Sequence, residues 1–494
     1  MKTKTPVPAG QSGGSLSVDT YSFMRPQVLI GCLLLFIGIL LRCILAAGTD
    51  FTISDAFITF RFAEQFGLGN GLVFNQGEMV GGNTSPLYSL LLGIGAMSGI
   101  GITALSRFIG ITFDVGVFFL VYRLTARLHS PWLRLAVPVL LFLHPMLLPN
   151  SVGGMETTLY LFLIYLLAYF ALEGTTLGYC LTVPTLLLCR PDGVLAIAVT
   201  MAFLMLSNYK RAMMPLFVVM LSGAAYAAMN YFLYDTLIPP TVAVKAFYGH
   251  SSIHENLVYV IKRFFLKQPF IFGAYMLASV AGIWTARRFK PALMFGLLTL
   301  AYLFFVLNVP TIRGWYVIPF IYTSFTAILL SVSFMICKIS KVVPAFSVLI
   351  PVCIFVLLAG IGFRLVYHEC LIYRANIATQ VEAGGVWIRE NTPPDAKILV
   401  SALETGYFAK RHTDDCPGLV SPRVFKMLKE SRVLDMFQMA DVLDIDYVFC
   451  MGKPTDYKLP ANFVFVKTFC SQIDDKYLGF NESCYSLYKR CAHE

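Results

Sequence analysis

The sequence predicts a polytopic α-helical membrane protein of about eleven transmembrane helices, followed by a soluble C-terminal α/β domain. Hydrophobic residues make up 57% of the 494 residues and charged residues 13%, and the mean hydropathy is +0.70, a balance that ordinary soluble domains do not show. Apolar windows of about 18 or more residues recur through the first 363 positions, and each could cross ~30 Å of hydrocarbon as a helix. From residue 364 these windows are absent and charges are frequent, which predicts a soluble domain.

Helical spans are predicted, in chain order, at 27–47, 106–123, 134–150, 155–173, 175–190, 193–208, 213–233, 268–285, 291–308, 317–336 and 342–363. A further apolar run, 86–104, is predicted to be an interfacial or re-entrant helix, because a crossing there would invert the charge pattern of the later loops. The first span is too long for a cleaved signal peptide and is expected to remain as an anchor. The preceding residues, 1–26, begin with a stretch rich in Gly, Ser, Thr and Pro and are expected to form a disordered cytoplasmic N-terminus.

Lys and Arg predict the orientation of the chain, because they gather in alternate short segments between the spans. Basic residues precede the first span and fill loops such as 123–134 and 287–290, which are therefore predicted to face the cytoplasm. The intervening segments, 48–85 above all, carry acidic residues and are predicted to face outward, as is the domain formed by residues 364–494. The formal net charge of +10 is explained by this topology, so nucleic-acid binding is not expected.

The C-terminal segment has the alternating pattern of a small α/β domain. Helical periodicity at 375–390 ends at "NTPPDA", whose prolines stop a helix, and the strand-like "KILVSA" follows. "VLDMFQMADVLDIDYVFCM" predicts a helix and then a strand, and "NFVFVKTFC" a further strand. Because an outward compartment permits disulfides, some pairing is expected among six cysteines, with the partners left open: Cys370, Cys416, Cys450, Cys470, Cys484 and Cys491.

The first outward segment, 48–85, contains the most informative charges. In "SDAFITFRFAEQFGLGNG" apolar residues recur at helical spacing around Asp55 and Arg61, which predicts a helix lying in the membrane interface. The turn-forming stretch "GNGLVFNQGEMVGGNTSP" then carries Glu78 and Asn83. An amphipathic connector whose charges simply face water would show the same composition. The segment is a candidate site only if other polar residues meet it.

Other outward segments supply such residues: "GGMET", "CRPDGV", "YDTLIPPTVAVKAF" and "TIRGWYVIP". Each also has a structural explanation, since an acid favours a helix N-terminus and an Arg can pair with an Asp in a tight turn. Several carboxylates and cations would nevertheless meet at one boundary between water and membrane. The candidate residues in these segments are Glu156, Arg190, Asp192, Lys245, Arg313 and Tyr316.

Asp114 is a separate case, because it lies inside the predicted span 106–123. A carboxyl group deep in a span is costly and marks a functional site by default. A structural role, in which Asp114 is protonated or paired with an Arg, is the favoured interpretation.

The stretch "SDAFITFRFAEQFGLGNGLVFNQGEMVGGNTSPLY" resembles the first extracytoplasmic loop of GT-C glycosyltransferases, in particular the subgroup of the mycobacterial terminal β-arabinofuranosyltransferase and its bacterial relatives. "GGMET", "RPDG", "LIPPTVAVK" and "WIRENTPPDAKI" extend the resemblance over most of the chain. Two departures stand out. Ser54 precedes Asp55 where relatives commonly have paired aspartates, and Pro239, Pro240 and Thr241 stand where they often have Pro-Asn-Thr.

The resemblance implies an enzyme of the bacterial cytoplasmic membrane that transfers sugar from a polyprenyl-phosphate donor to an envelope glycan or lipid acceptor on the extracytoplasmic face. A lipid phosphate is a good leaving group, so the reaction needs a base for the acceptor hydroxyl and cations for the departing phosphate. Asp55 is the expected base, and a single displacement would invert the anomeric centre. No cofactor is required, although loop carboxylates could bind a divalent metal. The expected phosphate ligands are Arg61, Arg190, Lys245 and Arg313, and Glu78, Asn83, Glu156, Asp192 and Tyr316 are the other expected substrate contacts.

Two other classes of protein fit part of the pattern. A transporter or flippase for lipid-linked sugars could use the same spans, although it would place charges deep in several helices and often contain a sequence repeat, which is not found here. A non-catalytic envelope assembly protein would explain the absence of the second aspartate. The identities of the sugar and the acceptor stay open.

Overall fold

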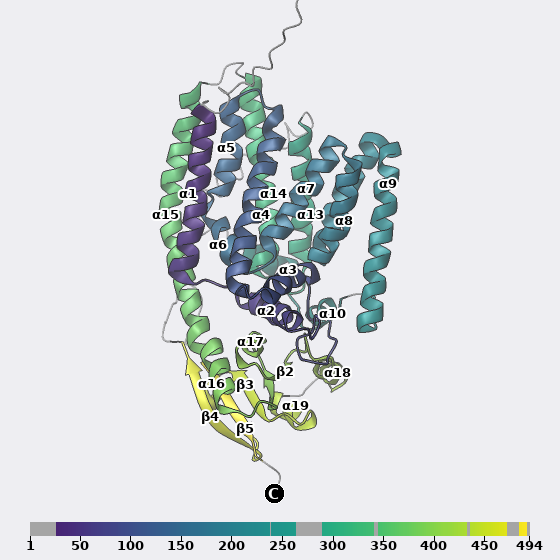
Figure 1. Ribbon diagram of the computed structural model, residues 1–494, viewed down its shortest axis with the longest axis vertical. Coiled ribbons are helices and arrows are strands. Elements are labelled where there is room, and N and C mark those ends of the chain that lie inside the picture. Colours follow the sequence, from purple (N-terminus) through teal and green to yellow (C-terminus); the bar gives the residue numbers. More distant parts are fainter. Residues whose placement is uncertain are drawn as a thin grey trace, which may run out of the picture.

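The computed structural model describes residues 26–237, 239–262, 289–339, 344–431, 435–471 and 484–491. A bundle of long helices forms one end of the molecule, and a small sheet covered by short helices forms the other (Figure 1). The predicted span 268–285 and almost all of the predicted N-terminal segment 1–26 lie outside the described residues.

The bundle confirms the prediction of a helical multi-pass membrane protein. Among the described residues six helices are long and apolar enough to cross a membrane, and four others are apolar but shorter, so the predicted number of eleven is not established. The main helices of the bundle are α1 (Pro26–Thr49), α4 (Ile102–Leu124), α5 (Pro131–Phe142), α7 (Thr157–Glu173), α8 (Thr176–Cys189), α9 (Val194–Tyr234), α13 (Lys290–Asn308), α14 (Gly314–Ile339) and α15 (Ala345–Ile377).

Three predicted spans do not correspond to separate continuous helices. The span predicted at 134–150 is not one helix: α5 ends at Phe142, and the chain continues as the short helices Pro145–Leu147 and α6 (Leu148–Val152), because Pro145 has no amide hydrogen to continue the helix. α9 contains both spans predicted at 193–208 and 213–233, separated by the non-helical backbone of Asn208 (φ −163°, ψ 93°).

Asp114 is paired inside the bundle, as the sequence favoured. The Arg42 guanidinium donates to its carboxylate from Nε at 2.9 Å, and the Ser151 hydroxyl donates at 2.7 Å. Arg42 and Asp114 are 0% and 2% exposed, and Arg42 also donates to the carbonyl oxygens of Gly38 and Phe142. The pair joins α1, α4 and α6 through a closed set of polar contacts.

Two short helices, α2 (Ser54–Gly67) and α3 (Pro86–Met97), lie between the bundle and the sheet domain. Figure 1 shows them crossing the end of the bundle. α3 forms the first part of the predicted run 86–104 and is too short to be counted among the spans, whereas the last residues of that run, from Ile102, already belong to α4. α2 forms where the spacing of its apolar residues predicted a helix, and most of its residues are buried.

The C-terminal domain is built on a five-stranded sheet of order β2-β1-β3-β5-β4. The strands are β1 (Lys397–Val400), β2 (His412–Asp415), β3 (Tyr447–Met451), β4 (Phe463–Cys470) and β5 (Cys484–Arg490). β1 is parallel to β2 and β3, whereas β5 is antiparallel to β3 and β4. The predicted strands correspond to β1, β3 and β4, while β2 and β5 were not predicted from the sequence. The predicted α/β architecture is confirmed.

Alternation along the strands gives the sheet an apolar core on each face. Ile398 and Val400 of β1 pack on one face beside α16 (Ala383–Asn391), whereas Leu399 packs on the other. The second face is covered by α18 (Pro422–Ser431) and α19 (Met436–Val442). α17 (Thr405–Ala409) follows β1 and lies on the side of the domain nearest α2.

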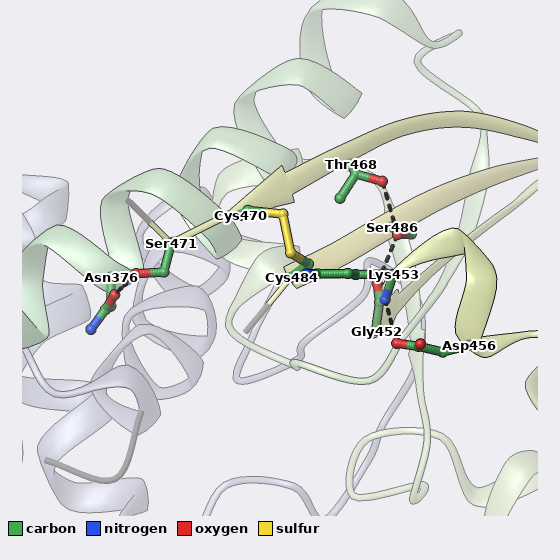
Figure 2. Close-up of a disulfide and its surroundings, with 9 residues drawn as sticks. All are labelled: Asn376, Gly452, Lys453, Asp456, Thr468, Cys470, Ser471, Cys484 and Ser486. Atoms are coloured by element: carbon green, nitrogen blue, oxygen red, sulfur yellow. Dashed lines mark hydrogen bonds between the residues drawn. A yellow bond between two sulfur atoms is a disulfide. The ribbon is translucent and has the colours of Figure 1, made fainter. Parts of the chain in front are cut away.

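One disulfide joins Cys470 at the end of β4 to Cys484 at the start of β5 (Figure 2). Beside it, the hydroxyl groups of Thr468 and Ser486 lie 3.0 Å apart across the same strand pair, and Ser486 donates to the carbonyl oxygen of Gly452 at 2.7 Å. The expected disulfide pairing therefore occurs for one pair, and the other four cysteines of the predicted set are free.

Candidate functional site

Helix α2 is held between the bundle and the C-terminal domain by aromatic contacts. The ring of Phe57 lies 4.7 Å from that of Phe408 and 5.5 Å from that of Tyr407, both on α17. At the far side of α2, Lys410 forms an ion pair with Glu64. The two domains are thus in direct contact at the segment that carries Asp55.

Arg61 and Glu78, two of the predicted substrate-binding residues, belong to this contact and do not line the cavity described below. Arg61 is buried and donates to the carbonyl oxygen of Phe74 at 3.2 Å and to that of Arg411 at 3.5 Å. Glu78 accepts from Asn75 at 3.2 Å and from Arg423 of α18 at 3.4 Å. Both side chains connect the first loop to the C-terminal domain.

A cavity of 740 Å³ opens where α2, the bundle and the C-terminal domain meet. The bundle contributes the segments around Glu156, Arg190 and Tyr316, and the C-terminal domain contributes the loops after β1 and β2. The first loop reaches the cavity through α2 and through Asn83, whose amide donates to Ser89 at 3.0 Å. The cavity brings together eight of the predicted site residues: Asp55, Asn83, Glu156, Arg190, Asp192, Lys245, Arg313 and Tyr316.

Arg190 is fixed in the cavity wall by two carboxylates. Its guanidinium donates to both oxygens of Asp192, from Nε at 2.9 Å and from Nη2 at 3.1 Å, and to Glu156 from Nη1 at 3.2 Å. The Tyr160 ring lies 4.8 Å below the guanidinium carbon. Most of the hydrogen-bonding capacity of Arg190 is therefore used within the protein.

Lys245 and Arg313 are the other two cations of the cavity. Lys245 lies on α10 (Pro240–Tyr248) and donates to the Tyr316 hydroxyl at 2.8 Å, and Arg313 lies just before α14. In the part of the chain that the structure describes, neither forms an ion pair with a carboxylate. Unlike Arg190, they can offer their charge to an anion in the cavity.

Asp55 lies in the first turn of α2, and two hydrogen bonds to segments distant in sequence fix the start of this helix. The backbone N–H of Ile53 donates to the carbonyl oxygen of Gly153 at 2.9 Å, and that of Ser54 to the Tyr373 hydroxyl of α15 at 3.0 Å. Burial raises the pKa of Asp55, and the positive charges of Lys245 and Arg313 oppose that rise. Asp55 thus lies within electrostatic reach of both available cations.

Glu404 is a cavity residue that the sequence did not reveal. It directly precedes α17 and lines the same cavity as Asp55. Burial raises its pKa to about 7, and the neighbouring charge of Asp55 contributes to the rise, while Arg313 opposes it. The only available signal was its place in "ETGYFAKRH", a stretch in a separate domain almost 350 residues beyond Asp55.

A metal site is not evident from the side chains. Among the described residues, no group of three or more His, Cys, Asp or Glu side chains could hold a metal ion. Two carboxylates of the cavity, Glu156 and Asp192, accept hydrogen bonds from Arg190.

The arrangement of the chain is similar to that of known membrane proteins. The crystal structure of ArnT from Cupriavidus metallidurans bound to undecaprenyl phosphate matches with a TM-score of 0.60 at 13% sequence identity, over 93% of this chain and 97% of that chain. The apo state of ArnT matches with a TM-score of 0.58. The oligosaccharyltransferase of Archaeoglobus fulgidus tethered with an acceptor peptide matches with a TM-score of 0.53 at 12% identity, over 86% of this chain and 69% of that chain.

This protein has the GT-C fold. No family model and no curated protein sequence matches the chain. The similarity lies in the GT-C arrangement as a whole and confirms the fold expected from the first loop. The closer resemblance to the mycobacterial arabinofuranosyltransferase stays a prediction from the sequence.

Proposed function

We propose that this protein is a glycosyltransferase that takes a sugar from a polyprenyl-phosphate donor and transfers it to a cell-envelope glycan or lipid acceptor. The main support for this proposal is that one cavity contains Asp55 and two cations, Lys245 and Arg313. Neither cation has a carboxylate partner among the described residues. This combination offers a base for a hydroxyl and a binding site for a departing phosphate.

The fold supports a lipid phosphate as the leaving group. ArnT, whose structure is similar over most of both chains, was crystallised with undecaprenyl phosphate. A cavity at the end of a helical bundle, with apolar walls from α13 and α14 such as Phe304 and Trp315, suits a ligand with a charged head and an apolar chain. These features support a lipid-linked donor in general and leave its sugar open.

The reaction follows from the two kinds of groups. Asp55 takes the proton of the acceptor hydroxyl, whose oxygen forms a bond to the anomeric carbon of the sugar. The bond from that carbon to the phosphate oxygen breaks, and its electron pair leaves with the phosphate. Lys245 and Arg313 stabilise the negative charge that develops there. One displacement of this kind inverts the anomeric centre, so a product that keeps the donor's configuration would contradict the mechanism.

Arg190 has a different role in this proposal. Because Asp192 and Glu156 hold its guanidinium, we assign it to ordering the wall against which the sugar lies. Arg190 contacts only one carboxylate oxygen of Glu156, and each oxygen of Asp192 keeps a second lone pair, so both side chains could accept from sugar hydroxyls. The reaction would take place on the extracytoplasmic side, as the distribution of Lys and Arg in the loops predicts, and in a bacterial cytoplasmic membrane, as the resemblance of the first loop implies.

A transporter for lipid-linked sugars is the weaker alternative. It would need charges inside the bundle that are free to bind a ligand. The most buried ion pair of the described bundle, Arg42 with Asp114, has its groups occupied by hydrogen bonds within the protein and lies outside the cavity. The charged groups that are available to bind a ligand, Lys245 and Arg313, lie instead in the cavity at the end of the bundle, where a transferase would need them.

The decisive experiment has two parts. Lipid-linked sugars and surface glycans are first analysed by mass spectrometry in cells with and without the gene, where an accumulating donor names the sugar and a truncated glycan names the acceptor. Purified protein in liposomes is then assayed with that donor and acceptor, and Asp55→Asn is expected to reduce transfer by about 10²–10⁴-fold. Unchanged transfer by Asp55→Asn would remove Asp55 as the base, and unchanged lipids and glycans in the deletion strain would reject the proposed function.

A further inference from the structure

The C-terminal domain contributes a carboxyl group, that of Glu404, to the cavity that Asp55 of the membrane domain also lines. Glu404 stands between β1 and α17, and its side chain is partly buried in the cavity wall. In the part of the chain that the structure describes, Glu404 forms no ion pair, unlike the neighbouring glutamates Glu64 and Glu78. A carboxyl group that is buried in a cavity wall and forms no ion pair is costly, which calls for a functional explanation.

The packing of the two domains fixes Glu404 beside Asp55. Leu403 is buried with Phe62 and Phe74 of the first loop, immediately before Glu404. Immediately after it, Gly406 lies so close to Phe74 that an added Cβ would be 3.0 Å from the ring. On α17 itself, the ring of Phe408 lies 4.7 Å from that of Phe57, which stands two residues after Asp55. α17 therefore packs on the start of α2, and Glu404 and Asp55 both line the cavity beside this contact.

We propose that Glu404 forms a carboxylate pair with Asp55, and that this pair, supplied by both domains, receives the proton of the acceptor hydroxyl. The inference rests on the proposed glycosyl transfer and extends it. In the step, the acceptor O–H bond breaks and its proton is retained by the pair, while the new oxygen–carbon bond forms and the phosphate leaves with the electrons of the broken bond. Glu404 acts through Asp55 and is a positioning residue in this scheme.

The electrostatic surroundings suit this role. Among the described residues, four titratable groups interact electrostatically with Glu404: Asp55 of α2, Arg313 just before α14, Tyr373 of α15 and Tyr485 of β5. Burial and the charge of Asp55 raise the pKa of Glu404 to about 7, so the two carboxyl groups together hold a proton far more readily than an exposed aspartate does. A base is most effective when its pKa lies near the working pH.

The proposed pair also offers an explanation for why Ser54 can replace the second aspartate. Relatives in the resembling subgroup commonly carry a second aspartate there, whereas here the backbone N–H of Ser54 donates to Tyr373. The second carboxyl group of this chain comes instead from Glu404, on the opposite side of the domain contact.

The test uses purified full-length protein added to membranes of a strain lacking the gene, which contain the unconsumed donor and acceptor. Transfer is followed by mass spectrometry between pH 5.5 and 8.5 for wild type, Glu404→Gln and Glu404→Asp. We expect the wild-type rate to rise through about pH 7 to a plateau. Glu404→Gln is expected to lower the plateau by about 10²-fold and to move the inflection to lower pH, and Glu404→Asp to restore part of both.

Glu64→Gln is the matched control, because it breaks the ion pair with Lys410 at the same domain contact but does not touch the cavity. It is expected to keep the wild-type pH profile. Binding of undecaprenyl phosphate and the thermal unfolding midpoint show that Glu404→Gln is folded. A wild-type rate and pH profile for Glu404→Gln, or equal losses for Glu404→Gln and Glu64→Gln with an unchanged profile, would overturn the pair while leaving the proposed function intact. Inactive wild-type protein would overturn both.

Discussion

Asp114 and Asp55 are both aspartates on helices made mostly of apolar residues, and the structure gives them opposite surroundings. Asp114 accepts from Arg42 and Ser151 and is almost completely buried. Asp55 lines a cavity, and no ion pair of its carboxylate occurs among the described residues. The charge of Asp114 is compensated by Arg42 within the fold, whereas Asp55 is available to interact with a ligand in the cavity. The contrast separates a structural charge from one that can act on a ligand.

The largest expected effect concerns the stability of Asp114 variants. Asp114→Ala leaves the Arg42 guanidinium buried without its counter-ion, which is expected to cost ~3–5 kcal/mol of the free energy of unfolding. Asp55→Asn is expected to cost nothing or to stabilise slightly, because burial raises the pKa of Asp55 and its ionised form is therefore disfavoured in the folded protein. Thermal unfolding in detergent, followed by tryptophan fluorescence, compares the two.

The control for that comparison removes both partners of the pair. The double substitution Arg42→Met with Asp114→Leu is expected to recover most of the stability that Asp114→Ala loses, since no unpaired charge is left. If Asp114→Ala unfolds at the wild-type temperature, the description of Arg42 and Asp114 as a structural pair is wrong.

A second comparison separates the cations of the cavity. Lys245→Gln and Arg313→Gln are each expected to weaken binding of undecaprenyl phosphate by ~1.5–3 kcal/mol, about 10-fold or more, with little change in stability. The fluorescence of Trp315, which lines the cavity, offers a direct titration signal. Arg190→Gln should instead reduce stability, because it leaves Glu156 and Asp192 without their shared cation.

Salt provides the control for these cation variants. The wild-type affinity for undecaprenyl phosphate should fall as ionic strength rises, and the variants should show a smaller dependence. Wild-type affinity in both Lys245→Gln and Arg313→Gln would mean that the phosphate binds elsewhere.

The contrast also explains what the sequence could predict. Apolar run lengths predicted the helical membrane fold, and helical spacing predicted α2, since both depend on the local chain. Charges in the predicted outward loops predicted most of the charged residues of the cavity, because short loops at one end of a bundle must lie near one another. Arg61 shares its helix and its spacing with cavity residues, but the direction of its side chain depends on where the C-terminal domain docks.

Glu404 could not be predicted for the same reason. Nothing in its local sequence distinguishes it from Glu64 or Glu382, which form ion pairs elsewhere at the domain contact. Its place beside Asp55 results from α17 packing on Phe57, a contact between segments almost 350 residues apart. The resemblance of the first loop predicted Asp55 as the base and showed Ser54 in place of a second aspartate, and in our proposal Glu404 of the C-terminal domain supplies the second carboxyl group.

The smallest expected effect is the pH dependence of stability that the Glu404 carboxyl group causes. The pKa of Glu404 is raised from 4.5 to about 7 in the folded protein, so the folded state holds this proton more tightly than the unfolded state does. The contribution of Glu404 to the free energy of unfolding therefore falls as the pH rises from 4.5 to about 7, and it stays low at higher pH. Glu404→Gln removes the penalty, and its unfolding midpoint should exceed that of wild type by more at pH 8 than at pH 5. Equal differences at the two pH values would show that Glu404 titrates as an ordinary exposed carboxyl group, and a gain in stability together with the loss of transfer would mark it as a group retained for activity.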